Sequence, residues 1–132
     1  VALLSLGTRL GECMQAASLL EAQNITTTVA DARFAKPLDE SLIRQLFKHH
    51  ELVVTIEEGS IGGFGSHVLC FAAKENLING KTRSLPLYLP DTFQEQNTPK
   101  AMYDEAGLNA AQIVASVLKS LGHAPALVKN AG

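Results

Sequence analysis

Two adjacent carboxylates and a cluster of glycines near the middle of the chain are the residues whose types and spacing best suggest chemistry. Glu57 and Glu58 end an apolar run, and glycines follow at positions 59, 62, 63 and 65. Paired carboxylates can serve as general acid and base. A glycine-rich turn between a strand and a helix can hold a phosphate group. The segment therefore has to be tested for both kinds of site.

The order of the residues argues against both kinds of site. Adjacent side chains on a strand point to opposite faces, so Glu57 and Glu58 share one site only if the strand has already ended. The glycines lack the Gly-Lys-Ser/Thr of a P-loop, and Val68 stands where a dinucleotide fingerprint has its third glycine. We expect a tight turn with close backbone packing and keep anion binding as the alternative. One carboxylate is expected to cap the next helix or to pair with a cation, for which Arg33 or a residue of another domain is the candidate.

Histidines and cysteines do not form an evident metal or nucleophile site. Neighbouring helical residues diverge by roughly 100 degrees, so His49 and His50 are poorly placed to chelate one ion and fit a helix C-terminus better. His67 follows the glycine turn and is expected to be structural or exposed. Cys13 and Cys70 both fall on apolar faces of expected helices, which predicts buried, reduced thiols. No catalytic, cofactor-binding or metal-binding residue is therefore assigned.

Charged residues recur where the expected strands end. Asp31 and Arg33 follow one strand, Glu58 follows the next, and Asp91 follows the last. The carboxyl ends of parallel strands meet at one edge of a sheet, where ligands and partner domains dock. The sequence therefore predicts a charged docking edge.

The elements that would position these residues alternate between strand and helix. Each expected strand is a short apolar run, and each expected helix has apolar residues at a spacing of three or four. The expected inner stripes include Met14 in the first helix and Leu69 in the third. Asp39 is an expected helix N-cap, Asn109 starts the last helix and Gly122 ends it. The expected strands cover residues 1–5, 25–30, 51–56 and 84–89, and the expected helices cover 9–22, 39–50, 66–76, 98–107 and 109–121.

This alternation predicts an α/β fold, a three-layer sandwich with a mostly parallel sheet and helices on both faces. Residues 1–122 are expected to form one domain and residues 123–132 a loose tail. Because Val1 already lies in an apolar strand, we expect the chain to be a fragment of a longer polypeptide.

Composition excludes some classes of partner. The 132 residues carry a formal net charge of −2, which gives no electrostatic drive toward nucleic acid or an anionic membrane. No apolar run is long enough to span a bilayer. The expected compartment is a bacterial cytoplasm, or a plastid stroma if the source is a plant or alga.

Several segments resemble one enzyme family. They are Asp31-Ala-Arg-Phe-Ala-Lys-Pro-Leu-Asp39, Val54-Thr-Ile-Glu-Glu-Gly59, Gly62-Gly-Phe-Gly-Ser66, Leu89-Pro-Asp-Thr-Phe93 and Ala106-Gly-Leu-Asn-Ala110. Together they resemble the C-terminal, transketolase-like domain of 1-deoxy-D-xylulose-5-phosphate synthases. The family's usual His-Gly pair is replaced here by Gln96-Asn97.

The resemblance implies a three-domain, homodimeric parent transferase. That enzyme condenses pyruvate with D-glyceraldehyde 3-phosphate, with loss of carbon dioxide, and supplies isoprenoid, thiamine and pyridoxal synthesis. Thiamine diphosphate (thiamine pyrophosphate) and magnesium bind domains absent from this chain, so the isolated chain is expected to be inactive. The resemblance also implies a sheet of five strands, one of them antiparallel, of which the sequence places four.

In such a parent this domain would serve dimerisation and docking of the other domains. The candidate interface residues are Arg33, Glu57, Glu58, Gly62, Gly63, His67 and Asp91. Two alternatives remain: the C-terminal domain of a 2-oxoacid dehydrogenase beta subunit, and a free-standing regulatory or anion-binding module.

Overall fold

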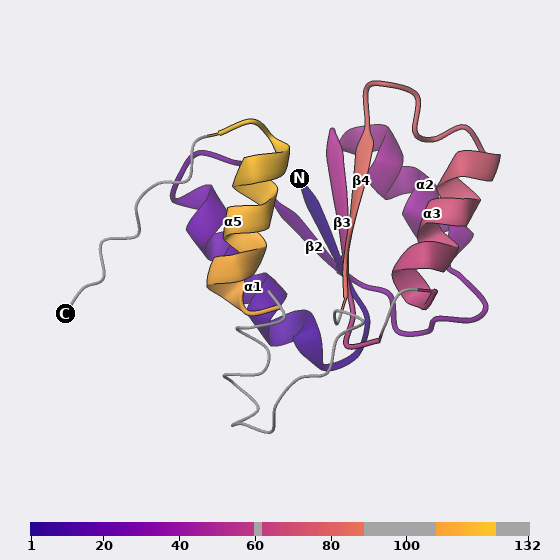
Figure 1. The fold of residues 1–132 in the computed structure, drawn as a ribbon, viewed down its shortest axis with the longest axis horizontal. Coiled ribbons are helices and arrows are strands. Elements are labelled where there is room, and N and C mark those ends of the chain that lie inside the picture. The colour runs from indigo at the N-terminus through magenta and orange to yellow at the C-terminus, as the bar shows by residue number, and fades with distance from the viewer. Residues whose placement is uncertain (60–61, 89–107, 124–132) are drawn as a thin grey trace.

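A four-stranded parallel sheet forms the centre of the molecule (Figure 1). The structure is a computed structural model, and it describes residues 1–59, 62–88 and 108–123. Its elements in chain order are β1 (Ala2–Ser5), the 3-10 turn η1 (Gly7–Arg9), α1 (Leu10–Glu21), β2 (Thr28–Asp31), α2 (Glu40–His49), β3 (Leu52–Ile56), α3 (Phe64–Lys74), β4 (Arg83–Leu87) and α5 (Ala110–Ser120).

The strands lie in the order β2-β1-β3-β4, and all three neighbouring pairs are parallel. Ser5 is paired with Asp31 on one side and with Ile56 on the other, and Ile56 is paired with Leu87. The carboxyl ends of the four strands therefore form one row, which we call the carboxyl edge.

Helices cover both faces of the sheet, which confirms the predicted three-layer α/β sandwich. Helices α1 and α5 lie on one face and α2 and α3 on the other (Figure 1). The chain leaves β1 and β2 in opposite directions across the sheet, so the helices that follow them lie on opposite faces. An antiparallel fifth strand is not present among the described residues.

Each face has its own apolar core, because successive residues of a strand point to opposite sides. In β3, for example, Val54 packs with α1 and α5, while Val53 packs with α2 and α3. The largest fully buried side chains are Leu3, Leu4, Leu20, Ile43, Leu52, Ile56, Leu108 and Ile113, followed by Val53, Val54, Val68 and Val117.

Most expected elements occur within one or two residues of their predicted positions, but two inner faces were assigned incorrectly. Met14 was placed on the inner stripe of α1 and is 56% exposed; Cys13, Ala16 and Leu20 are the buried residues instead. Leu69 was placed inward on α3 and is exposed. Both errors have the same cause, since an apolar side chain next to the buried stripe of a helix looks like part of it in the sequence.

Several predicted features lie outside the described residues. These are the expected helix over 98–107, the position of Asp91 and most of the tail predicted for 123–132. Among the described residues, no helix combines the length and apolar character needed to cross a bilayer.

Candidate functional site

The carboxyl ends of β1 and β3 form the point at which the sheet topology reverses. β1 continues into η1 and α1 on one face, while β3 leads to α3 on the other. In open α/β sheets, a crevice at such a point is the usual ligand site. Here the position is occupied by the protein's own side chains.

Glu57 caps helix α3. Its Oε2 accepts a hydrogen bond of 2.7 Å from the backbone N–H of Phe64, the first residue of the helix, and the side chain is almost completely buried. The first backbone N–H groups of a helix lack partners within it, and a carboxylate also interacts favourably with the positive end of the helix dipole. This confirms the prediction that one of the two carboxylates caps the next helix.

Glu58 points to the other face of the sheet. Its Oε1 lies 3.2 Å from Nε of Arg9 and accepts a hydrogen bond from the hydroxyl of Thr8. The Arg9 side chain is only 11% exposed. The prediction that Arg33 pairs with one of these carboxylates is therefore wrong. Within the described part of the chain, the cation that pairs with Glu58 is Arg9. Residues 8 and 58 are fifty positions apart, and no local pattern links them.

The glycine turn before α3 has the structural role that the sequence predicted. Gly62 has a φ of +94°, in the left-handed region, and its N–H donates to the Ser66 hydroxyl at 2.9 Å. Gly63 is the N-cap position of α3. A Cβ on Gly65 would lie 2.7 Å from Oγ1 of Thr55, so this glycine lets the helix approach β3 closely.

This arrangement leaves little for an anion to bind. The N–H of Phe64, at the start of α3, already donates to Glu57, and the negative charge of that carboxylate would repel a phosphate group. Close packing of the turn is thus favoured over the phosphate alternative.

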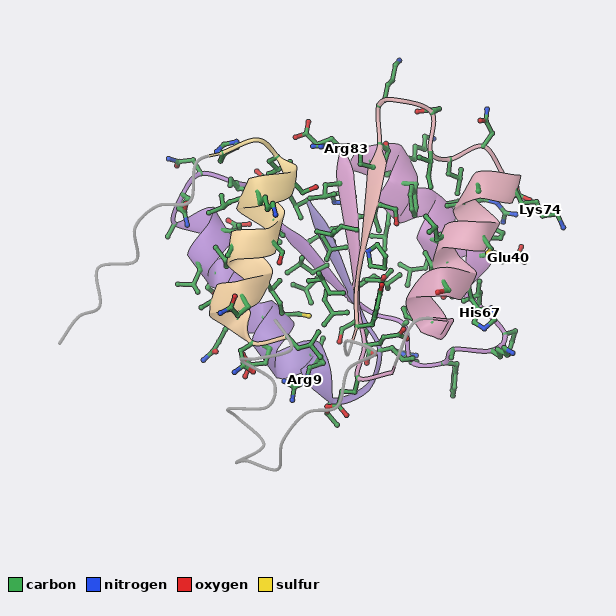
Figure 2. All side chains as sticks on the ribbon, in the orientation of Figure 1. Arg9, Glu40, His67, Lys74 and Arg83 are labelled. Atoms are coloured by element: carbon green, nitrogen blue, oxygen red, sulfur yellow. The ribbon has the colours of Figure 1, made fainter. Side chains whose placement is uncertain are left out.

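The remaining titratable candidates do not converge on one site. His67 is half-buried in α3, at the same end of the molecule as Arg9 and opposite Arg83 (Figure 2). His50 contacts the Leu46 carbonyl through Nδ1 and the Thr28 hydroxyl through Nε2, both at 2.8 Å. No group of three or more His, Cys, Asp or Glu residues suited to a metal ion occurs among the described residues.

The two cysteines differ, and the prediction that both are buried is correct only for Cys13. Burial raises the pKa of the Cys13 thiol to about 11, and the positive charge of Arg9 opposes that rise. Cys70 is exposed, because the buried stripe of α3 runs through Phe64, Val68 and Ala72.

The segment after β2 is built differently from the one after β3. The backbone N–H of Arg33 donates to Oδ1 of Asp31 at 2.9 Å, and Arg33 has a φ of +61°. Asp39 caps α2 by accepting from the N–H of Leu42 at 3.0 Å, as predicted. Between these two anchors, Phe34 is 67% exposed and lines a surface hollow.

Of the seven predicted interface residues, six lie in the described part of the chain. Arg33, Glu57 and Glu58 follow strands that end at the carboxyl edge, and Gly62, Gly63 and His67 belong to the turn before α3 and its first helical turn.

Sequence reasoning missed Arg9 and Thr8, which pair with Glu58. It also missed Glu12, whose Oε2 accepts from the N–H of Ala110 at 2.7 Å and so caps α5 from a distance of 98 residues.

Comparison with known proteins gives a consistent family. The profile described as "Transketolase, C-terminal domain" matches residues 1–113. A solved structure described as "Split gene transketolase, inactive beta4 tetramer" is 33% identical, with a TM-score of 0.81, and the match covers 92% of this chain and 39% of that one. The transketolase from Campylobacter jejuni subsp. jejuni NCTC 11168 is 18% identical, with a TM-score of 0.53, over 89% of this chain and 16% of that one. This chain thus spans well under half the length of either.

Proposed function

Because the chain belongs to the transketolase C-terminal domain family, we propose that it is the C-terminal domain of a 1-deoxy-D-xylulose-5-phosphate synthase. The observation that carries this proposal is the family match over residues 1–113. The segment Asp31-Ala-Arg-Phe-Ala-Lys-Pro-Leu-Asp39 supports the choice of synthase within the superfamily, because it is the most specific part of the resemblance.

The reaction of the parent enzyme would be the condensation of pyruvate with D-glyceraldehyde 3-phosphate, with loss of carbon dioxide. Its product would supply isoprenoid, thiamine and pyridoxal synthesis. Thiamine diphosphate would provide the electron sink for decarboxylation, and magnesium would hold its diphosphate. The described residues of this chain do not fit either group: they form no carboxylate-rich metal site, and the first amide of α3 is capped by Glu57. We therefore assign both groups to other domains of the parent.

On its own, this chain is proposed to be inactive. The two carboxylates that most resemble an acid/base pair point to opposite faces and are engaged by Phe64 and by Arg9 with Thr8. The 33% identical relative described as "Split gene transketolase, inactive beta4 tetramer" supports the same conclusion. The role left for this domain is to dock the other domains and contribute to a homodimer, in a bacterial cytoplasm or a plastid stroma.

The C-terminal domain of a 2-oxoacid dehydrogenase beta subunit is the second candidate. The Glu57-Glu58-Gly59 and Gly62-Gly-Phe-Gly65 segments occur in that family too and do not separate the two. The free-standing anion-binding module is less favoured, because Glu57 occupies the first amide that such a module would offer.

Carbon dioxide release from labelled pyruvate by the complete enzyme that contains this chain tests the proposal. With thiamine diphosphate and magnesium present, we expect release that requires glyceraldehyde 3-phosphate and yields a deoxypentulose phosphate. Release independent of the aldehyde, or acetyl transfer to a lipoyl acceptor, would move the chain to the dehydrogenase family. The chain 1–132 alone, as the matched control, should release none.

A further inference from the structure

The loop between β2 and α2 carries the most exposed large apolar side chain in the described part of the chain. Phe34 is 67% exposed, compared with 56% for Met14 and 47% for Leu19. It stands beside a hollow lined by both apolar and charged residues, among them Asp31, Arg33, Pro37, Leu38 and Leu42. Isolated exposed apolar residues are common on protein surfaces, so the surroundings of Phe34 have to decide whether it has a role.

The backbone leading into Phe34 is held in place. The N–H of Phe34 donates to the carbonyl of Ala32 at 2.6 Å, and the N–H of Arg33 donates to Asp31. Arg33 has a φ of +61°, a conformation that is uncommon for residues other than glycine. A backbone fixed in this way has less ordering entropy left to lose on binding.

The acidic and basic side chains of the loop differ in the partners they have within the domain. The carboxylates of Asp31 and Asp39 each accept a hydrogen bond from a backbone N–H of the same loop or the following helix. The side chains of Arg33 and Lys36 are exposed, and neither has an ion pair within residues 1–59, 62–88 and 108–123. The loop thus offers an exposed aromatic ring next to a guanidinium group that has no ion pair within the described residues, and a complementary surface would carry a carboxylate.

We propose that Phe34 and Arg33 together anchor this domain on the other domains of its parent enzyme, at a surface that has an apolar pocket beside a carboxylate. The ring would fill the pocket, and the planar guanidinium would pair with the carboxylate through parallel N–H···O bonds. Aromatic and arginine side chains in central, desolvated positions supply most of the binding energy of typical protein interfaces. The inference rests on the proposed function, because it places the partner surface in that parent.

Met14 and Leu19 provide the internal comparison. They are also exposed, but they lie on α1, away from the loop after β2. The charged side chain that lines the hollow beside Met14, Glu21, accepts a hydrogen bond from the N–H of Thr27, and the lining beside Leu19 is uncharged. They therefore serve as references for an exposed apolar position outside the proposed anchor.

Thiol labelling of the complete enzyme tests the proposal. Phe34→Cys and Leu19→Cys are each made in a Cys70→Ser background, which removes the exposed native thiol. In this domain position 34 is the more exposed, yet in the complete enzyme we expect it to react at least tenfold more slowly than position 19. In denaturant the two rates should become equal. Native labelling at position 34 that is as fast as at position 19 overturns the proposal, unless the substitution itself releases the loop.

A second labelling site that keeps both anchor residues shows whether replacing Phe34 has itself released the loop. Lys36→Cys leaves Phe34 and Arg33 in place, and we expect it to be protected in the complete enzyme in the same way. Adding Phe34→Ala or Arg33→Glu should then raise its labelling rate about tenfold, whereas the exposed control Arg83→Glu, at the opposite end of the molecule (Figure 2), should not change it. Unprotected Lys36→Cys overturns the proposal.

Labelling with and without inorganic phosphate distinguishes a protein partner of Arg33 from a small dissolved anion. Protection that appears only when phosphate is added would mean that Arg33 binds a dissolved anion, and the proposal would be wrong. The labelling rates do not depend on which reaction the enzyme catalyses. Carbon dioxide release without the aldehyde would therefore reject the synthase assignment while leaving the docking result readable, and the reverse also holds.

Discussion

Two segments that leave the same edge of the sheet use their polar groups in opposite ways. After β3, Glu57 and Glu58 are engaged by a helix N-terminus and by Arg9 with Thr8, all within the domain. After β2, Asp31 and Asp39 fix the backbone, while Arg33 and Phe34 extend away from it. The first segment holds the sandwich together, and the second presents side chains to the outside. Residue type alone does not distinguish them, because both are short charged segments after a strand.

Overpacking the junction between β3 and α3 should have the largest effect on stability. Gly65→Val would place its Cβ 2.7 Å from Thr55 Oγ1 and 3.2 Å from Pro86 Cβ, so we expect a loss of about 3 kcal/mol in the free energy of unfolding. Gly11→Val is the matched control, since a Cβ there meets nothing within 4 Å and the change should stay within about 0.5 kcal/mol. Urea unfolding of both variants measures the difference. Equal midpoints would show that α3 can shift away from β3 at no cost.

Removing the cap on α3 should come next. Glu57→Ala leaves the N–H of Phe64 without its acceptor at a buried position, which should cost about 2 kcal/mol. Glu57→Gln keeps an oxygen acceptor without the charge, and we expect it to retain about half of that stability. Chemical unfolding of both variants, with the exposed Glu40→Ala as reference, checks the order. A Glu57→Ala protein as stable as wild type would contradict the structural role of this carboxylate.

Alkaline pH should lower the free energy of unfolding through Cys13, whose thiol is buried beside β1. No such effect is expected from the loop after β2. Because the pKa of Cys13 is about 11 in the folded protein and lower when unfolded, the unfolded state loses its proton first. The contribution to stability is complete below about pH 9 and falls by on the order of 2 kcal/mol by pH 11.

Unfolding free energies measured across that range in wild type and in Cys13→Ala isolate this contribution. The wild type should lose the additional stability, and the variant should lack this part of the decrease. Parallel pH profiles for the two proteins would mean that the thiol is not protected by burial.

Loss of the α2 cap should have a smaller effect. Asp39→Ala removes the acceptor for the N–H of Leu42 at an exposed helix start, with an expected cost of about 1 kcal/mol. Asp39→Asn retains a capping oxygen and should restore most of that stability. Thermal unfolding of the two variants measures the difference, and identical values for Ala and Asn would argue that the cap is dispensable.

The smallest change in stability should come from the residues that point outward. Phe34→Ala and Arg33→Ala remove exposed side chains, so each should change the unfolding free energy of the chain 1–132 by less than about 0.5 kcal/mol. A larger loss would place these side chains among the groups that stabilise the fold. It would also remove the contrast with the segment after β3.

The sequence predicted most of the architecture, because the signals involved are local. Alternating apolar runs and helical spacings identified the four strands, and Asp39 and the positive φ of Gly122 confirm the predicted helix start and end. The glycine turn and its role in close packing were also predicted correctly, since glycine has few other reasons to recur at those positions.

The candidate site was predicted only in part. That Glu57 and Glu58 diverge follows from strand geometry, and that one caps a helix follows from the helix that comes after. The partner of Glu58 was missed, because Arg9 approaches it only when β1 and β3 are neighbours in the sheet. Cys70 and Leu69 were assigned to the wrong face of α3, because the face of a helix that is buried depends on what packs against it.

The sequence by itself thus determined the elements, the local caps of α2 and α3 and the alternation that requires a parallel α/β sandwich, because each depends on neighbours a few residues away. The tertiary structure decided the strand order, the pairing of Arg9 with Glu58 and the capping of α5 by Glu12 from 98 residues away. It also decided which charged segment is used inside the domain and which exposes its side chains. The physical reason is that a charge is satisfied by whatever group the fold brings within about 3 Å, and sequence separation carries no information about that distance.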